Sequence, residues 1–322
     1  DWTPSTDNVG VTAYRVYRST TPVSTDSSPT PWNELAALST ATWSWTGAED
    51  PAAPYYMVRS ENINSDLSLS ERSLIRSAAT LEGFVVAPDD HSYFRIPAAQ
   101  IAPLVGTAGN AASAYAIVAS SRPQDLGGRV YKSLDFKAYR AGQTHEPGFT
   151  LGGMGTLYLH YEISGSSLAP SFFGPASSPE NASVYWWNGS RWLQLYGKVS
   201  ALTQDLLLET KYFGQYQIRS VERAEGFSFN LAGLSNRFGT PNGDGKNDAV
   251  VFTFDNPRDA QVRGSILDMR GRVVVSELQP GPLQNSLQWD GTAGGRGVPG
   301  GVYIYRLEGD GQSFTGTIVI LK

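Results

Sequence analysis

The sequence of 322 residues contains no cysteine, and only 17% of its residues carry a charge. The absence of cysteine excludes disulfide bonds, thiolate metal sites and cysteine nucleophiles. The low charge content argues against long charged helices and coiled coils. No apolar run approaches the roughly 18 residues of a membrane-spanning helix, so the sequence predicts no transmembrane segment.

The charges that are present are nearly balanced. Lysine and arginine number 25, against 30 aspartates and glutamates, which gives a formal net charge of −5. A nucleic-acid site needs a basic face to meet the phosphates, so this balance argues against DNA or RNA as a partner.

Turn formers and aromatic side chains are abundant instead. The chain has 34 Gly, 19 Pro, 8 Trp, 16 Tyr and 13 Phe, and this many aromatic groups can build cores, which excludes a disordered chain. Short segments with a period of two lie between the turn signals, as β-strands do. We therefore predict an all-β fold of three tandem β-sandwich domains, Ig-like or fibronectin III-like, over residues 1–78, 79–225 and 226–322.

The first predicted domain contains alternating segments at residues 13–18, 42–46 and 56–60. The line from Trp2 to Val11, followed by Tyr14-Arg15-Val16-Tyr17-Arg18, resembles a bacterial fibronectin type III domain.

That resemblance implies that Trp2 ends strand B and that Tyr14–Arg18 is strand C. Residues 55–60 then match strand F, and residues 67–70 the approach to strand G. Strand A and most of strand B would precede Trp2. A sandwich without them would leave apolar surface and a sheet edge open. We expect either that the sequence is a fragment of a longer protein, which we favour, or that another chain supplies the missing strands.

The second predicted domain has strand-like segments at residues 84–86, 93–97, 114–118, 156–162 and 212–218. Its strongest signal is the aromatic hairpin Ser183 to Trp192. A two-residue turn is expected at Asn188-Gly189, because both residues tolerate positive φ. The β-rich block, the hairpin and the closing Phe-Gly-x-Tyr segment together are similar to the ZU5-like sandwich modules of bacterial surface proteins.

The third predicted domain opens with the loop Thr240 to Asp248, before a strand at 250–254. A hairpin follows at 266–274 with its turn at Arg270-Gly271, and then come Trp289-Asp290-Gly291 and a strand ending at Tyr305. This order resembles the Ig-like C-terminal modules of secreted bacterial proteins, namely the FlgD-type Ig-like domain and the gliding-motility or type IX-secretion C-terminal domains. The resemblance implies a secretion or anchoring role for this domain.

The loop of the third domain is a candidate metal site. Asn242, Asp244, Asn247 and Asp248 offer oxygen atoms, and the intervening glycines allow a tight wrap. Calcium prefers six to eight oxygen ligands, so a structural Ca²⁺ ion suits this pattern. The alternative is a turn whose side chains bond to their own backbone.

The aromatic hairpin is a candidate carbohydrate surface. Tyr185 and Trp187 share one face of the predicted strand, with Asn188 beside them. Aromatic rings next to an amide can stack on and bond to a sugar. The alternative is an ordinary hairpin covered by a loop or by a neighbouring domain.

Catalytic motifs are absent from the sequence. His160 and Glu162 lie two residues apart on a predicted strand, but no third ligand stands at a recognisable spacing, and neither a nucleophile elbow nor a phosphate-binding loop occurs. We therefore expect no enzymatic activity.

Taken together, these features predict a non-catalytic extracellular or cell-surface protein that acts in display, adhesion, or assembly into a surface layer or filament, including assembly by strand addition. Its expected partners are other protein chains, either copies of itself or surface components, and polysaccharide. Two alternatives stay open: accessory modules that trail a secreted glycosidase or protease, and a carbohydrate-binding module.

Overall fold

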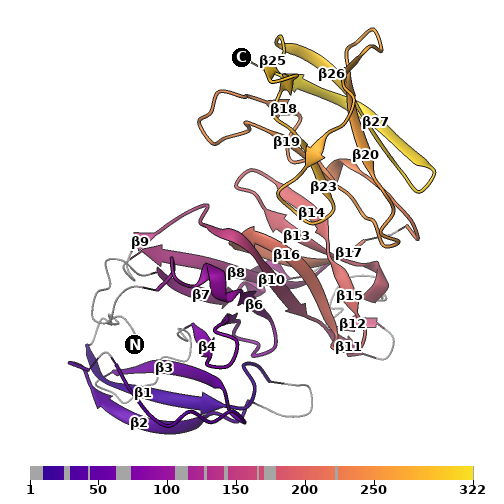
Figure 1. Cartoon of the computed structure of the whole chain (residues 1–322). Coiled ribbons are helices and arrows are strands. Elements are labelled where there is room, and N and C mark those ends of the chain that lie inside the picture. The colour runs from indigo at the N-terminus through magenta and orange to yellow at the C-terminus, as the bar shows by residue number, and fades with distance from the viewer. Residues whose placement is uncertain are drawn as a thin grey trace. The chain divides into compact units, whose positions relative to one another are not determined.

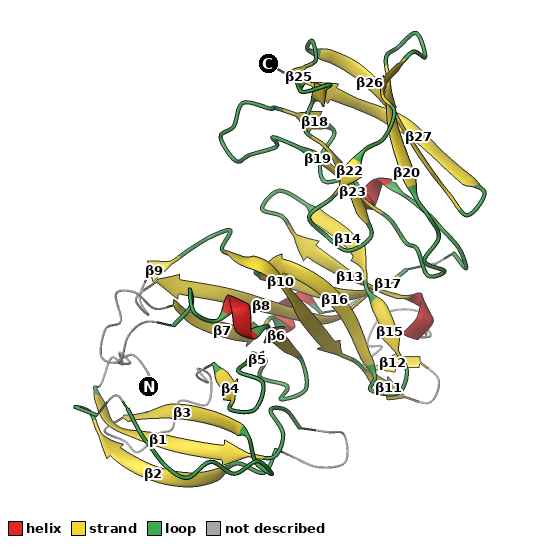
Figure 2. Ribbon diagram, viewed as in Figure 1, coloured by secondary structure: helices red, strands yellow, loops and turns green. Residues whose placement is uncertain are grey.

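The computed structural model describes residues 10–24, 30–42, 44–62, 74–105, 115–126, 129–140, 144–164, 167–169, 179–221 and 224–321. Within these ranges the regular structure consists of strands and short 3-10 helices, which confirms the predicted all-β class (Figure 2). No helix of the described residues is long and apolar enough to cross a membrane. The chain forms two compact units: Asp1–Ala176 with Ser200–Ile218, and Ser177–Val199 with Arg219–Lys322.

The first unit contains the strands β1 to β12 together with β16 and most of β17 (Figure 1). They are β1 (Val11–Ser19), β2 (Asn33–Ser39), β3 (Tyr55–Asn62), β4 (Ile75–Ser77), β5 (Gly83–Val86), β6 (Tyr93–Ile96), β7 (Tyr115–Ser121), β8 (Val130–Arg140), β9 (Thr144–His145), β10 (Thr150–His160), β11 (Glu162–Ser164), β12 (Ser167–Ala169), β16 (Asp205–Tyr212) and most of β17 (Gly214–Ser220). Two 3-10 helices, η1 (Ala98–Gln100) and η3 (Pro123–Asp125), lie in its loops.

One long antiparallel sheet dominates this unit. Its strands follow the order β16-β10-β6-β5-β4-β3-β1-β2. The first and second predicted domains meet within it, because Ile75 of β4 pairs with Phe84 of β5. Apolar side chains on both sides of that junction form one buried cluster, with Met57 and Ile75 before it and Phe84 and Val86 after it.

The first unit also contains β17, β8 and β7, which are neighbours in that order within another sheet and pack against the long one. Aromatic rings fill the space between the two sheets. Phe94 of β6 meets Phe136 of β8 edge-on, with 6.1 Å between ring centroids, and stacks on Phe213 at 4.9 Å. All three side chains are buried, so this pair of layers has the core of a β-sandwich.

The second unit contains the remaining strands. They are β13 (Ala182–Trp187), β14 (Trp192–Tyr196), β18 (Phe238–Gly239), β19 (Val250–Thr253), β20 (Arg263–Leu267), β21 (Val273–Val275), β22 (Gln279–Pro280), β23 (Ser286–Trp289), β24 (Thr292–Ala293), β25 (Arg296–Gly297), β26 (Gly301–Gly309) and β27 (Gln312–Ile320). The 3-10 helices η4 (Pro179–Asn181) and η5 (Leu231–Gly233) belong to it as well, and β15 (Lys198–Ser200) lies where the chain passes from this unit to the first.

The C-terminal residues form a two-layer sandwich. One sheet follows the order β18-β27-β26-β20-β21, and the other the order β19-β23-β22. Phe252 of β19 and Tyr305 of β26 face each other across the layers, with ring centroids 5.0 Å apart. Alternate residues of β26 and β27 enter this core, as their period of two predicts.

Some local expectations differ from the structure. Residues 44–50 form no strand, although the segment 42–46 alternates, and Trp43 lies outside the described residues. The segments Trp2 to Val9 and 67–70, on which the fibronectin resemblance partly rests, also lie outside them. The predicted boundary near residue 78 falls between two paired strands of one sheet. The three domain ranges stay a prediction.

Candidate functional site

The aromatic hairpin forms as predicted, but its turn is longer. Trp187 of β13 pairs with Trp192 of β14, so four residues, 188–191, make the loop. Gly189 takes a positive φ of 93°, and the Asn188 side-chain oxygen accepts N–H groups from Ser190 and Arg191. The prediction of a two-residue turn is therefore wrong. The Asn188 side chain closes a longer loop by accepting these two N–H groups.

An arginine covers part of the hairpin's aromatic face. The Arg219 guanidinium lies 4.5 Å from the ring centroid of Tyr185 and 4.6 Å from that of Trp192. Trp187 lies against Trp192, with 5.6 Å between ring centroids. These half-buried rings share the face that the sequence assigns to a sugar, and Arg219 already occupies part of it through cation–π contacts.

The hairpin loop is also bonded to the segment that leads into the C-terminal sandwich. Asn188 Nδ2 donates to the Ser235 carbonyl at 3.3 Å, and Arg191 donates to the Leu231 carbonyl at 2.8 Å. Asn230 donates to Gln194 at 3.0 Å. The amide group of Asn188 is thus engaged on both its oxygen and its nitrogen. Carbohydrate binding by Tyr185, Trp187 and Asn188 stays a prediction.

The candidate calcium loop is organised around Asp248. The two carboxylate oxygens of Asp248 accept backbone N–H groups of Asn242, Gly243 and Gly245 at 2.7–3.0 Å. Positive φ angles of 79° and 81° at the two glycines aim those N–H groups at the carboxylate. The backbone here cradles an anion, as successive N–H groups commonly do.

The other predicted ligands bond within the loop too. Asp244 accepts the Lys246 N–H and the Asn242 amide, which together lower the pKa of Asp244. Asn247 accepts from Asn236 at 2.9 Å. The described residues hold no group of three or more acidic or histidine side chains that could bind a metal. The loop oxygens meet N–H donors, so this geometry fits the self-bonded turn better than a Ca²⁺ cage. Calcium binding stays a prediction.

Several polar residues of the first unit pair with residues that are distant in the sequence. His160 does not act together with Glu162: its Nδ1 lies 3.3 Å from Asp205, and its ring stacks on His91 at 4.8 Å. Asp89 forms an ion pair with Lys132. The sequence could not predict these partners, because the two residues of each pair lie 43 or more positions apart.

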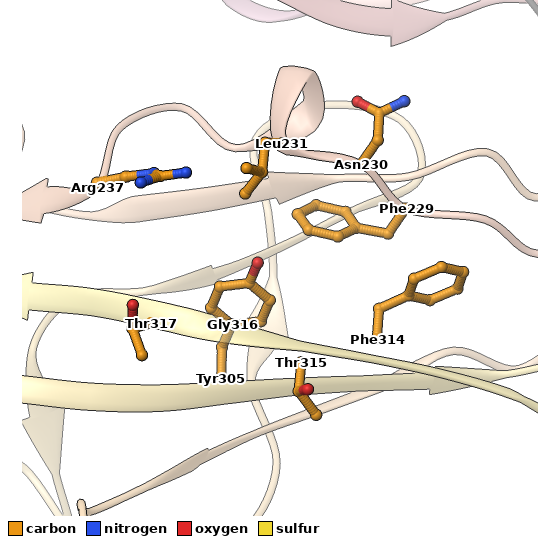
Figure 3. A pocket seen from close by; sticks show the side chains of 9 residues that line it. All are labelled: Phe229, Asn230, Leu231, Arg237, Tyr305, Phe314, Thr315, Gly316 and Thr317. Atoms are coloured by element: carbon orange, nitrogen blue, oxygen red, sulfur yellow. The ribbon is translucent and has the colours of Figure 1, made fainter.

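A hollow in the C-terminal sandwich escaped the sequence analysis altogether. It has a volume of about 310 Å³, and Figure 3 shows its lining: Phe229, Asn230, Leu231, Arg237, Tyr305, Phe314, Thr315, Gly316 and Thr317. One wall is the segment that runs from η5 to β18. The other side is formed by β26 and β27.

Glycine at position 316 shapes this hollow. Gly316 pairs with Tyr305 across the two strands, and a Cβ atom at Gly316 would come within 2.3 Å of the Tyr305 hydroxyl oxygen. The tyrosine ring therefore lies across β27, and its hydroxyl points over the hollow toward the segment with Leu231 and Arg237 (Figure 3). Only a glycine permits this crossing.

The Tyr305 hydroxyl has no hydrogen-bond partner among the described residues, although only 2% of the residue is exposed. Burial raises the pKa of Tyr305, and the nearby Arg237 charge opposes that rise. The hydroxyl is therefore a protonated donor at neutral pH. The exposed Arg237 guanidinium forms no ion pair within the described part of the chain.

The hollow borders an open sheet edge. The N–H groups of Val319 and Leu321 donate to the carbonyls of Arg237 and Gly239, which closes the end of β27 with the two-residue β18. N–H groups alternate between the two sides of a strand. Those of Ser313, Thr315 and Thr317 therefore point to the side of β18, beyond its reach, where no described residue pairs with them.

No protein-family model matches the chain, and no curated protein matches it either. Among solved structures the chain is similar to PorZ, an essential bacterial surface component of the type-IX secretion system of Porphyromonas gingivalis. The sequences are 9% identical, with a TM-score of 0.23, and the match covers 85% of this chain and 44% of that one. This chain therefore spans less than half the length of that protein.

Proposed function

We propose that this chain is a non-catalytic structural and interaction protein of the bacterial cell surface, which engages protein partners through the edges and loops of its sandwiches. The observation that carries the proposal is the long sheet of the first unit. Pairing of β4 with β5 joins residues of two predicted domains into one sheet. Separate domains usually move relative to each other. A sheet that both predicted domains share restricts such motion, which suits a protein that presents surfaces at fixed positions.

The sheet edges support the interaction part of the proposal. β2 is an outer strand of the long sheet, and β27 is covered over only two residues by β18. An edge strand offers backbone N–H and C=O groups with which a segment of another chain can pair. These two open sheet edges support assembly with other protein chains by strand addition.

Two further parts of the proposal rest on the sequence alone. The FlgD-type resemblance of residues 226–322 supports a secretion or anchoring role for the C-terminal sandwich. The non-catalytic part rests on the lack of a nucleophile elbow and of a phosphate-binding loop in the sequence.

Cross-linking on intact cells tests the proposal. Source cells are treated with a membrane-impermeant reagent that joins lysines, which reaches the exposed Lys198 and Lys246 of a surface protein. We expect these lysines to be joined to peptides of other protein chains. Recovery of the chain without any such adduct, when a known surface protein in the same cells is cross-linked, would contradict the proposal.

A further inference from the structure

The geometry points to a docking site for an extended peptide segment on the open edge of β27, in which the segment adds a strand beside Thr315 and Thr317 and places a carboxylate against Arg237. This inference rests on the proposed function, because it names the partner chemistry at one of the sheet edges. The site consists of the β27 edge, the hollow and its two donors, Tyr305 and Arg237.

The backbone of β27 supplies the first part of the recognition. Thr315 and Thr317 direct their N–H and C=O groups outward on the side where β18 continues the sheet. An incoming strand would occupy the place that β18 leaves empty and would satisfy these groups in register. Main-chain bonds of this kind give affinity without side-chain specificity.

The hollow supplies the second part. Alternate side chains of an added strand point to the same face, so every second side chain of the segment would enter the space beside Tyr305 and Gly316. A hollow of about 310 Å³, lined by Phe229, Leu231 and Phe314, has room for one large apolar side chain.

Charge complementarity fixes the class of occupant. Tyr305 and Arg237 both donate hydrogen bonds at this site, and neither side chain is bonded within the described residues. Because Tyr305 and Arg237 are both hydrogen-bond donors and Arg237 is positively charged, the complementary group is an anionic acceptor such as a carboxylate. Because Arg237 flanks the end of the groove at β18, the carboxylate belongs two residues from the apolar side chain, on the same face of the added strand.

A titration of the full chain, followed by the backbone amide resonances of Thr315 and Thr317, tests the inference. The probes are two acetylated and amidated peptides, Thr-Phe-Thr-Glu-Thr and its reverse Thr-Glu-Thr-Phe-Thr, which cover both strand directions. We expect one of them to shift these two resonances saturably. The same peptide with Gln in place of Glu should bind about tenfold more weakly, since a charge-assisted bond is lost.

Three variants locate the binding. Arg237→Gln should weaken binding about tenfold, and it should abolish the preference for Glu over Gln in the peptide. Tyr305→Phe keeps the ring in place and should weaken binding about three- to tenfold, because one hydrogen bond is lost. Thr315→Pro removes one outward N–H group and should abolish binding. The matched control, Arg296→Gln, removes an exposed charge outside the groove and should bind like the unaltered chain.

Equal binding by Arg237→Gln and the unaltered chain would overturn the assignment of the carboxylate. Failure of both peptides to shift Thr315 and Thr317, or shifts confined to other residues, would overturn the site itself. Circular dichroism shows that each variant is folded, so a loss of binding is not mistaken for unfolding. The proposed function fails separately, through the intact-cell cross-linking, which does not use the groove.

Discussion

At the scale of single residues, close backbone contacts place strict limits on side-chain size. Gly233 of η5 lies against β19, and a Cβ atom there would approach the Thr253 carbonyl oxygen to 2.0 Å. Neither partner can move away easily, since Thr253 and its neighbour Phe252 are fully buried in the core. This glycine is therefore required for packing and not for its φ angle.

We expect Gly233→Ala to destabilise the C-terminal sandwich by about 1–3 kcal/mol, the usual cost of an added methyl group in a packed interior. Urea unfolding followed by tryptophan fluorescence measures the effect. The matched control is Gly297→Ala, because a Cβ atom at Gly297 meets nothing within 4 Å. Equal midpoints for the two variants would show that the contact at Gly233 is not as close as described.

The ion pair between Asp89 and Lys132 makes the stability of the fold depend on pH. Burial of Asp89 alone would raise its pKa, but Lys132 and the hydrogen bonds from Ser92 outweigh burial and hold the pKa below its usual range. A carboxyl group whose pKa is lower in the folded state stabilises the fold above its unfolded pKa, about 3.9, and that contribution is lost as the pH falls through the folded pKa.

We expect Asp89→Asn to cost about 1–2 kcal/mol at pH 7, because the variant keeps the oxygen that accepts the Ser92 N–H but loses the charge pair with Lys132. The difference from the unaltered chain should shrink as the pH falls below about 4. Thermal unfolding from pH 3 to pH 7 measures it, with the exposed Asp259→Asn as control. A difference that stays constant over this range would contradict the account.

At the scale of elements, alternation in the sequence predicts most strands of the sandwiches. It succeeds for β1, β10 and β26, whose apolar residues alternate toward a core. It fails for the alternating segment 42–46, whose described residues form no strand. A period of two shows that a segment can be a strand, but pairing decides whether it becomes one.

The candidate sites show the same limit of sequence reasoning. The loop from Asn242 to Asp248 could be recognised in the sequence, because its candidate ligands lie within seven consecutive residues. The pair of Tyr305 and Gly316 could not, because it depends on the register between β26 and β27. A glycine amid the alternating residues of the last strand was the available signal, since strand glycines often mark a close approach.

The bonds of the calcium-candidate loop lead to a prediction at this scale. We expect Asp248→Ala to lower the melting temperature by a few degrees, because three backbone N–H groups lose their acceptor. Addition of Ca²⁺ or of a chelator should leave the melting temperature of the unaltered chain unchanged. A rise with Ca²⁺ that Asp248→Ala abolishes would instead support the metal site that the sequence predicts.

At the scale of the whole molecule, the shared sheet changes the expected unfolding behaviour. Three independent domains would give three transitions. The residues on either side of position 78 belong to one sheet and one apolar cluster, so they should unfold together. We expect calorimetry to show no transition that belongs to residues 10–62 alone. A separate early transition assigned to residues 10–62 by limited proteolysis would contradict this coupling.

The central claim is that this chain acts by binding protein segments at its sheet edges. Site-specific photo-cross-linking in intact source cells tests it most directly, with a benzophenone amino acid at Thr315 and, as control, at Arg296. The account predicts that the label at Thr315 joins the chain to a peptide with an acidic residue two positions from an apolar one, and that the label at Arg296 does not. Equal labelling from both positions, or no protein adduct at Thr315, would contradict it.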